Sequence, residues 1–385
     1  MDSYRILARR KPRTPSLPNH PNVTVHSLRS AWGLLSPLVA QQTGRTWPKT
    51  NAILKILFSK RFDVIHYHNI SMLGPEVLRL QPDYRDFIKL YTTHEHWLVC
   101  PMHVLWKNNQ RPCERPQCFR CTLAFHRPPQ WWRYTKLLRS CIASVDTFIS
   151  PSSFTRDAHH QRGFASQITV IPNFVSEIAP ASPPDPSPHM RPYFLFVGRL
   201  EKIKGVETLL PVFDRYPQAD LLIAGTGTME NELHTRARHM GNVRFLGLLS
   251  SEQLQGLYRH ALAVLLPSAG YEVFPLVTLE AFQHRTPVIA HSIGGLTEIL
   301  EQSSAGFLYR DAAELLSALD RMQSDPGLRR EMGDRGYRAY QEKWTETVHL
   351  DSYFQILEET AVRKLGTVPW KQPTRALQPL RPKEG

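Results

Sequence analysis

The sequence lacks any long apolar run. Its longest apolar stretches, such as Ala261 to Leu266, are only as long as a strand, whereas a membrane-spanning helix needs about 18 apolar residues. The first residues, Met1 to Arg5, are not followed by the apolar core that a secretory signal peptide requires. These absences argue against a membrane-spanning or secreted protein, and we expect a cytoplasmic one.

Cysteines are few and odd in number, which argues against the disulfide framework of a small secreted protein. Cys100, Cys113, Cys118 and Cys121 lie close together, and the last three read C-x4-C-x2-C. Thiolates spaced in this way within one loop can hold a structural zinc ion, so these four are candidate metal ligands. Reduced loop cysteines and a disulfide remain the alternatives.

Acidic residues are scarce in the first half of the chain. Residues 1–180 contain 24 Lys and Arg against 10 Asp and Glu, whereas residues 181–385 contain 23 against 24. The net charge of +13 therefore comes from the first half. A positive field on one side attracts nucleic acid, an acidic membrane surface or a phosphorylated substrate. A basic surface that only aids solubility is the alternative.

The chain has enough apolar residues to form two domains. It has 385 residues, of which 42% are hydrophobic, and one core rarely serves so long a chain. The Pro-rich run 179–188 can form neither helix nor strand and therefore indicates a linker. We predict a first domain over residues 1–178, a linker over 179–192 and a second domain over 193–349.

Short apolar runs alternate with helical patterns in both predicted domains. Buried strands that alternate with helices indicate βαβ units, and therefore an α/β fold with two doubly wound parallel sheets. Such domains bind ligands at the carboxyl ends of their strands. The predicted strands are Tyr4 to Ala8, Val23 to His26, Val64 to His68, Ile88 to Thr92, Thr147 to Ser150, Ile168 to Ile171, Tyr193 to Val197, Ala219 to Ala224, Val243 to Leu246, Ala263 to Leu266, Val288 to Ala290 and Gly306 to Tyr309. The clearest predicted helices are Met229 to Met240, Ser251 to His260 and Ala312 to Gln323.

Three segments of the second domain predict a phosphate-bearing ligand. Arg199 and Lys204 follow the strand Tyr193 to Val197, and their cations suit phosphate oxygens. The small residues Ala224 to Gly227 follow the next strand and let a ligand approach the backbone. In the third segment, Tyr271 to Ala281, a proline opens a predicted helix whose first N–H groups can bind an anion.

Two glutamates, Glu272 and Glu280, frame the start of this predicted helix. Eight residues separate them, so we expect them to bracket one ligand rather than to form a close acid/base pair. A solvated helix face is the alternative. The apolar neighbours of Glu280 favour a ligand, because a carboxylate on a buried stripe needs a partner such as a sugar hydroxyl.

The sequence resembles glycosyltransferase family 4, a group of retaining enzymes with the GT-B fold, from about Tyr4 to Leu365. The block His94 to Pro101, with the cysteines after it, is similar to a subgroup of that family. The matching motifs are E-x7-E at Glu272 and Glu280, the segment Gly198 to Gly205, and the segments Phe62 to Asn69, Thr93 to Glu95, Val170 to Asn173, Ala224 to Gly227 and Gly294 to Glu298.

The resemblance implies a role for each matching residue. Arg199 and Lys204 would neutralise the donor diphosphate, and Glu280 would hold the ribose hydroxyls. Glu272 would contact the donor sugar, and His94 of the other domain would face that sugar. A core or capping histidine is the alternative for His94. The remaining donor-binding positions would be Gly198, Gly225, Gly227, Phe274, Pro275 and Leu276.

The resemblance also implies the reaction and its partners. It predicts transfer of a hexosyl unit from a nucleotide-diphosphate sugar to a sugar or lipid-linked acceptor, with retained configuration, in cell-envelope polysaccharide or glycolipid synthesis. The chain has no D-x-D motif, so we expect no metal or other cofactor to be needed for catalysis. We expect the first domain to bind the acceptor, residues 350–365 to form a helix that crosses back to it, and residues 366–385 to be disordered.

Two departures from the family pattern stand out. Pro275 replaces the usual glycine and removes one backbone donor. The segment Tyr4 to Ala8 resembles the second strand of the family, so the usual first strand and its glycine-rich loop are missing. Either the true start lies upstream of Met1, or the chain is an inactive relative that binds nucleotide sugars.

The basic first half of the chain suggests an anionic membrane as a further binding partner. Trp131 to Lys136 combines aromatic and cationic side chains, which suits the headgroup layer of an anionic membrane. We therefore expect the inner face of the plasma membrane as a location, with a packed helix as the alternative for this segment. A nucleic-acid partner is not expected, because it would leave the E-x7-E pair without a role.

Overall fold

The computed structural model describes residues 4–8, 22–28, 35–178 and 186–371. The chain divides into two compact units. The first comprises residues 1–91, 128–147 and 357–385, and the second comprises residues 92–127 and 148–356. These units do not follow the predicted domain boundaries, which remain a prediction.

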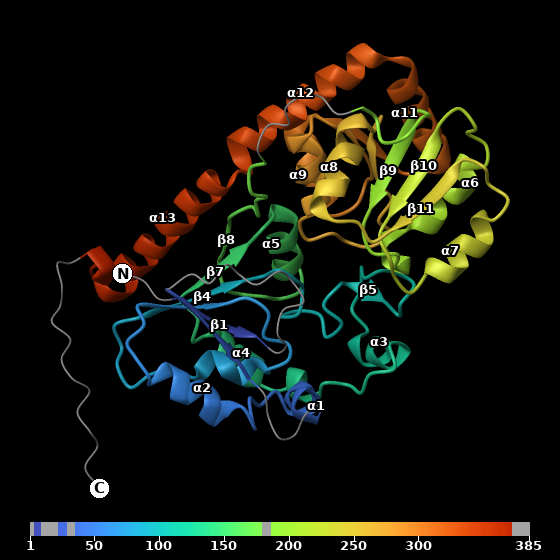
Figure 1. Cartoon of the computed structure of the whole chain (residues 1–385). Coiled ribbons are helices and arrows are strands. Elements are labelled where there is room, and N and C mark those ends of the chain that lie inside the picture. Colours follow the sequence, from blue (N-terminus) through green and yellow to red (C-terminus); the bar gives the residue numbers. More distant parts are fainter. Residues whose placement is uncertain (1–3, 9–21, 29–34, 179–185, 372–385) are drawn as a thin grey trace, which may run out of the picture. The chain divides into compact units, whose positions relative to one another are not determined.

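A six-stranded parallel sheet forms the centre of the second unit (Figure 1). Its strands follow the order β11-β10-β9-β12-β13-β14, which is the doubly wound order 3-2-1-4-5-6 of a Rossmann fold. The predicted α/β fold is therefore confirmed, and each of its six strands lies within one residue of the predicted range. The strands are β9 (Tyr193–Val197), β10 (Asp220–Ala224), β11 (Val243–Gly247), β12 (Val264–Leu266), β13 (Val288–His291) and β14 (Gly306–Tyr309).

Hydrophobic cores cover both faces of this sheet. Successive side chains of a strand point to opposite faces, so each apolar strand contributes to both cores. Phe194 and Phe196 of β9 enter one core, and Tyr193 and Leu195 enter the other. Helices α6 (Leu210–Phe213), α7 (Glu230–Ala237) and α11 (Ala312–Ser324) cover the first face. Helices α8 (Ser251–His260), α9 (Leu276–Gln283) and α10 (Gly295–Ser303) cover the second, and α12 (Pro326–Lys343) contributes to both cores.

The second unit also contains the segment with the cysteines. Strands β7 (Thr147–Ser150) and β8 (Ile168–Val170) pair in parallel, and helix α5 (Ser153–His160) lies between them in the chain. Short strands β5 (Trp106–Lys107) and β6 (Arg111–Pro112) form an antiparallel pair before helix α3 (Cys118–Ala124). We call residues 99–127 the cysteine loop. Two 3-10 turns, η3 (Lys202–Lys204) and η4 (Val206–Thr208), follow β9.

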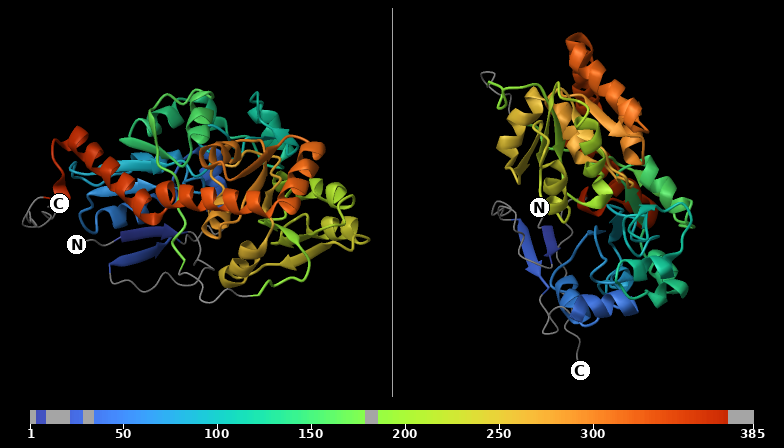
Figure 2. Two further views of the ribbon diagram at one scale, coloured as in Figure 1. Left: turned by 90° about the horizontal axis from the view of Figure 1, so that it is seen from above. Right: turned by 90° about the vertical axis from the view of Figure 1, so that its right-hand side faces the viewer.

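Parallel strand pairs also form the first unit. Strands β1 (Tyr4–Ala8) and β2 (Val23–Ser27) lie side by side (Figure 2), and β3 (Val64–Tyr67) pairs with β4 (Ile88–Thr92). The predicted strands at these positions are confirmed to within one residue. The helical segments are α1 (Leu35–Thr43), α2 (Thr50–Leu57), α4 (Leu137–Ile142), η1 (Pro75–Arg79), η2 (Trp131–Tyr134) and η5 (Pro369–Lys371).

Helix α13 (Glu346–Leu365) begins in the second unit and ends in the first. Within the first unit, Thr360 and Thr147 join their hydroxyls at 2.8 Å, and Lys364 pairs with Asp146 at 2.8 Å. Residues 179–185, most of the Pro-rich run in the predicted linker, lie outside the described residues. So do residues 372–385, most of the tail that is predicted to be disordered.

The aromatic segment Trp131 to Lys136 divides its side chains between the core and the surface. Trp132 is buried, and its indole N–H donates to the carbonyl oxygen of Gln41 at 2.8 Å. Trp131 and Tyr134 are 62% and 63% exposed. Trp132 is therefore packed into the fold, and contact of Trp131 and Tyr134 with a membrane stays a prediction. Among the described residues, the helices are too short or too polar to cross a membrane.

Candidate functional site

The predicted phosphate-binding loops lie at the switch point of the six-stranded sheet. Strands β9 and β12 are neighbours, and the chain leaves them toward opposite edges of the sheet. In open α/β sheets this is where ligands bind, beyond the carboxyl ends of the strands. The loop after β9 carries Arg199 and Lys204, and the loop after β12 carries Glu272. The fold thus brings together two sequence segments about 70 residues apart.

Lys204 and Glu272 form an ion pair at the centre of this site. The Lys204 ammonium lies 2.6 Å from Oε1 of Glu272, and both side chains are largely buried, with 26% and 18% exposure. The Ser268 hydroxyl donates to the same carboxylate oxygen at 2.6 Å, and Nδ1 of His291 lies 2.9 Å from the carbonyl oxygen of Ser268. Sequence reasoning missed Ser268 and His291, since no motif links them to the glutamate.

Close contact between backbones fixes the position of Lys204. Gly205 has a φ of +68°, and a Cβ atom there would lie 2.1 Å from the carbonyl oxygen of Pro267. The N–H groups of Ala269 and Gly270 donate to the carbonyl oxygen of Ile203 at 2.9 and 3.1 Å. The η3 turn is thereby tied to the loop that carries Glu272, so the ion pair rests on a rigid backbone.

The glycines after β10 pack closely against the loop after β9. A Cβ atom on Gly225 would lie 1.8 Å from the carbonyl oxygen of Gly198, and one on Gly227 would lie 2.4 Å from that of Leu200. The N–H of Gly198 donates to Ala224 and that of Leu200 to Thr226, each at 3.0 Å. These glycines allow the β9 and β10 loops to pack backbone against backbone. Contact between these glycines and a donor stays a prediction.

The backbone of Glu272 is held from a second direction by α10. The N–H of Gly295, the first residue of α10, donates to the carbonyl oxygen of Glu272 at 3.0 Å. A Cβ atom on Gly295 would lie 2.8 Å from that oxygen, so a larger residue would displace the loop. The Gly294 to Glu298 motif therefore positions Glu272 through backbone contacts.

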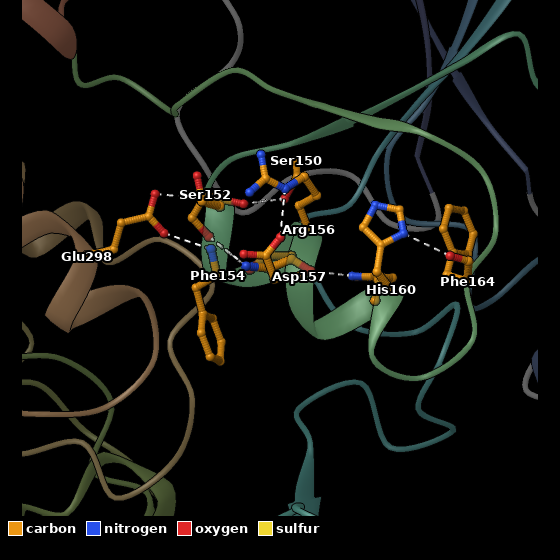
Figure 3. A network of polar contacts seen from close by, with 11 residues as sticks. Ser150, Ser152, Phe154, Arg156, Asp157, His160, Phe164 and Glu298 are labelled. Atoms are coloured by element: carbon orange, nitrogen blue, oxygen red, sulfur yellow. Dashed lines mark hydrogen bonds and ion pairs between the residues drawn. The ribbon is translucent and has the colours of Figure 1, made fainter.

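Helix α5 supports the same loop through its N-terminus. Figure 3 shows Glu298 beside Ser152 and Phe154 at the start of this helix. The Ser152 hydroxyl caps α5 by accepting from the N–H of Thr155 at 3.1 Å, and it donates to the carbonyl oxygen of Val273 at 2.7 Å. The Glu298 carboxylate accepts from the N–H groups of Ser153 at 2.9 Å and Phe154 at 2.8 Å. A carboxylate suits this end because the free N–H groups of a helix carry a partial positive charge.

Replacing Glu298 by alanine is expected to lower the free energy of unfolding by about 1–2 kcal/mol, because two N–H groups at the start of α5 lose a charged acceptor. Urea unfolding at pH 7 measures this loss. Glu301→Ala is the control, since Glu301 lies on α10 like Glu298 but is exposed. Equal stability of the two variants would contradict the capping role of Glu298.

Glu280 is the fifth residue of α9, just over one turn after the loop, and is half-buried. The Tyr258 hydroxyl donates to its Oε2 at 2.6 Å, and the Tyr258 ring stacks on His284 at 5.5 Å. Burial, and then the charge of Glu280, raise the pKa of Tyr258, so the phenol keeps its proton. Burial lowers the pKa of His284 to about 4, which leaves that ring neutral at pH 7. Glu280 thus has a fixed donor on one oxygen.

The start of α9 presents backbone donors near these carboxylates. Pro275 is the N-cap, with extended φ and ψ of −80° and 98°, and the Thr278 N–H donates to its carbonyl oxygen at 3.0 Å. Leu276 is 41% exposed, whereas Phe274 packs against the second core. Arg199 is exposed after β9. These groups are available to an anion, and their contact with a donor stays a prediction.

His94 follows β4 and is exposed, although surrounding atoms partly desolvate its ring and lower its pKa. A core or capping role therefore remains the alternative for it. The buried histidine of this block is His96, and burial lowers its pKa well below the usual range. Glu95 pairs with His103, at 2.9 Å between Oε2 and Nδ1. A contact between His94 and a donor sugar stays a prediction.

The cysteines do not form a metal-binding group in the structure. Across the described residues, which include all five cysteines, no three or more His, Cys, Asp or Glu side chains are arranged to hold a metal ion. Cys100, Cys113 and Cys121 are buried in an apolar cluster with Met102 and Leu105. Burial raises the pKa of Cys100 to about 11 and also raises that of Cys113, which keeps both as thiols. The arrangement described is therefore that of reduced core cysteines, and zinc binding stays a prediction from sequence.

Two family models match almost the whole chain. The model described as Glycosyltransferase Family 4 matches residues 5–177, and the model described as Glycosyl transferases group 1 matches residues 180–339. An uncharacterised glycosyltransferase of Methanocaldococcus jannaschii is 36% identical over 160 residues, 39% of this chain and 40% of the relative. The glycogen synthase of Mycobacterium tuberculosis H37Rv is 39% identical over 141 residues, 34% of each chain. The matches therefore span about two fifths or less of these relatives.

Solved structures share the whole fold. Sucrose-phosphate synthase from Thermosynechococcus elongatus superposes with a TM-score of 0.70 and 23% identity, covering 91% of this chain and 88% of the other. The Anabaena protein HepE in complex with UDP superposes with a TM-score of 0.59 and 18% identity, covering 88% and 86%. At these identities the likeness shows the fold alone. With both family models matched on a GT-B fold, the chain belongs to the family-4 type of GT-B glycosyltransferases.

Proposed function

We propose that this chain transfers a hexosyl unit from a nucleotide-diphosphate sugar to an acceptor hydroxyl, with retained configuration. The observation that carries the proposal is the cluster at the switch point, where Lys204, Glu272 and the start of α9 follow neighbouring strands. Cations and free N–H groups suit a diphosphate, and carboxylates suit sugar hydroxyls. The HepE structures contain UDP, in one case with glucose, which supports a nucleotide-sugar donor.

In the proposed reaction, the bond between the sugar C1 and the diphosphate oxygen breaks, and a bond from the acceptor oxygen to C1 forms on the same face. The acceptor proton passes to the departing diphosphate. Arg199 and Lys204 neutralise the growing negative charge, which is the usual role of fixed cations at a leaving group. The Lys204 ammonium has three N–H groups, so it can hold Glu272 and a phosphate oxygen together.

Glu272 and Glu280 are proposed to bind hydroxyl groups at the two ends of the donor. Glu272 binds the sugar, and its position is fixed by Lys204, Ser268 and the backbone of α10. Glu280 binds the ribose through the oxygen that Tyr258 does not engage. We place the acceptor in cell-envelope polysaccharide or glycolipid synthesis at the inner face of the plasma membrane, in keeping with the exposed Trp131 and Tyr134 of the basic first half.

A thermal-shift panel with UDP, GDP, ADP and TDP tests the donor site. A nucleotide present at 100 times its dissociation constant adds about 2.7 kcal/mol to the stability of the folded protein, which is a clear rise in Tm. We expect one nucleotide to stabilise the wild type and to lose about tenfold in affinity in Glu280→Gln, as when one charged hydrogen bond is weakened. Glu342→Gln on the exposed side of α12 is the matched control.

Each result of the panel has a clear meaning. Stabilisation that Glu280→Gln loses and Glu342→Gln keeps supports the proposed ribose contact. Equal stabilisation of all three proteins would remove Glu280 from the donor site. If no nucleotide stabilises the wild type, the chain does not bind a nucleotide donor and the proposed function fails.

A further inference from the structure

A cavity of about 480 Å³ lies beside the loop that carries Glu272. This volume falls within the range of about 300–1,000 Å³ that is typical of ligand sites. All of its walls belong to the second unit. The lining residues are Val99, Glu114, Pro116, Gln161, Arg162 and Tyr271.

The cysteine loop and the Glu272 loop form this cavity together. A Cβ atom on Gly270 would lie 3.2 Å from the ring of Trp106 in the cysteine loop, so the two segments are in direct contact. The next residue, Tyr271, packs its ring against Phe154 at 5.1 Å and lies on the buried cysteine cluster. Glu272 follows immediately. The cavity is therefore lined by the residue that immediately precedes Glu272, to which we assign the donor sugar.

One polar group of the cavity wall, the Arg162 guanidinium, is held in place before any ligand arrives. Arg162 donates from Nη1 to the carbonyl oxygen of Ala158 at 3.0 Å and from Nη2 to that of Cys113 at 2.5 Å. Its Nε is buried and has no hydrogen-bond partner among the described residues. These bonds orient the guanidinium at the cavity wall, and the unpartnered Nε shows that its donors are not all satisfied by the protein.

The lining has the composition of a site for a neutral sugar. Glu114 supplies acceptors, Gln161 supplies both donors and acceptors, and the Tyr271 hydroxyl can act as either. The single cation of Arg162 is balanced by the single carboxylate of Glu114, so the cavity does not favour an anion. Val99, Pro116 and the Tyr271 ring provide apolar surface for the C–H groups of a pyranose.

We propose that this cavity is the acceptor subsite, which binds the terminal neutral sugar of the acceptor through Glu114, Gln161 and Tyr271. The cysteine loop thereby sets which acceptor is used, and its buried cysteines serve to pack that loop. This inference rests on the proposed function, because it takes the neighbouring Glu272 as the residue that holds the donor sugar.

Saturation-transfer NMR with a set of methyl glycosides tests the subsite. The probes are the methyl α- and β-glycosides of glucose, galactose, mannose, N-acetylglucosamine and rhamnose, with inorganic phosphate as a separate arm. The protein is the full chain, with and without the nucleoside diphosphate that stabilises it. We expect at least one glycoside to bind, and Glu114→Gln and Tyr271→Phe each to weaken that binding about five- to twentyfold, as when one hydrogen bond to the ligand is lost.

The controls separate this inference from the proposed function. Nucleotide binding should be unchanged in both variants, and Glu342→Gln should bind nucleotide and glycoside as the wild type does. Arg162 is left intact because its bonds to backbone carbonyls support the fold. Failure of every nucleotide to bind counts against the donor site alone, since the glycosides are also titrated without nucleotide.

Three outcomes would overturn the subsite. The first is that no glycoside binds the wild type, with or without nucleotide. The second is that glycosides bind all the variants equally, which would place them elsewhere on the protein. The third is that phosphate, rather than a glycoside, shows binding that depends on Glu114 and Tyr271, which would assign the cavity to an anion.

Discussion

Glu272→Gln is expected to lower sugar transfer from the nucleotide-sugar donor by about 10²–10³-fold, the usual effect of losing one fixed charged group at a reacting centre. The neutral amide cannot pair with the Lys204 ammonium as the carboxylate does at 2.6 Å. It also binds a sugar hydroxyl less strongly, since hydrogen bonds to charged groups are about twice as strong as neutral ones. Release of the nucleoside diphosphate, measured at saturating donor, reports the change in kcat.

Lys204→Ala tests the other member of the ion pair. Lys204 and Glu272 share one ion pair, so the double variant should lose less activity than the product of the two single losses. Glu342→Gln is the control for the loss of one carboxylate from the surface of the same unit. Wild-type turnover in Glu272→Gln and in Lys204→Ala would remove both residues from the reaction.

Gly205→Ala is expected to lower the free energy of unfolding by about 3–5 kcal/mol, the sum of backbone strain and overpacking. The residue has a φ of +68°, and its new Cβ would lie 2.1 Å from the Pro267 carbonyl oxygen, which has no flexible side chain to move aside. The η3 turn with Lys204 and the loop with Glu272 would have to separate. Guanidinium unfolding, followed by tryptophan fluorescence, measures the loss.

Gly163→Ala is the matched control for the Gly205 variant. Gly163 has a similar φ of +82°, but a Cβ atom there would meet nothing within 4 Å. It should therefore cost only the backbone strain of a left-handed residue, about 1–2 kcal/mol. A Gly205 variant no less stable than the Gly163 variant would show that the two loops are not locked together at this point.

The sequence predicted the strands of the six-stranded sheet because each one is a short apolar run between polar loops. Tyr193 to Val197 is such a run, and the structure has the same bounds for β9. The relative positions of the strand ends followed from the doubly wound order, which places the β9 and β12 loops together. The fold and the meeting of these segments at one site were therefore predictable from the sequence, whereas the ion pair between Lys204 and Glu272 appears only in the structure.

Hydrogen bonds between residues far apart in the sequence could not be predicted from the sequence pattern. Ser152 supports the Glu272 loop from more than 100 positions away, and Tyr258 holds Glu280 from a different helix. Such contacts depend on the angles at which helices meet the sheet, which hydrophobic periodicity does not specify. The sequence predicts that Gly225 and Gly227 let a ligand approach the backbone, but their close contact with the β9 loop appears only in three dimensions.

The cysteine loop shows a second limit of pattern reasoning. The spacing of its cysteines suits a metal site, but it suits a small apolar core equally well, because free cysteine is itself a buried hydrophobic residue. The structure describes the second arrangement. The loop then contributes to function through its surface, where Glu114 lines the cavity beside Tyr271.

Proton NMR of the reaction mixture tests the central claim most directly. The wild-type chain is mixed with the nucleotide sugar whose nucleotide stabilises it and with the methyl glycoside that binds it, and the anomeric signals are followed with time. The account predicts that the donor is consumed and that the new glycosidic bond has the anomeric configuration of the donor, with Glu272→Gln nearly inactive. A product of opposite configuration, or a donor that binds and is never consumed, would contradict it.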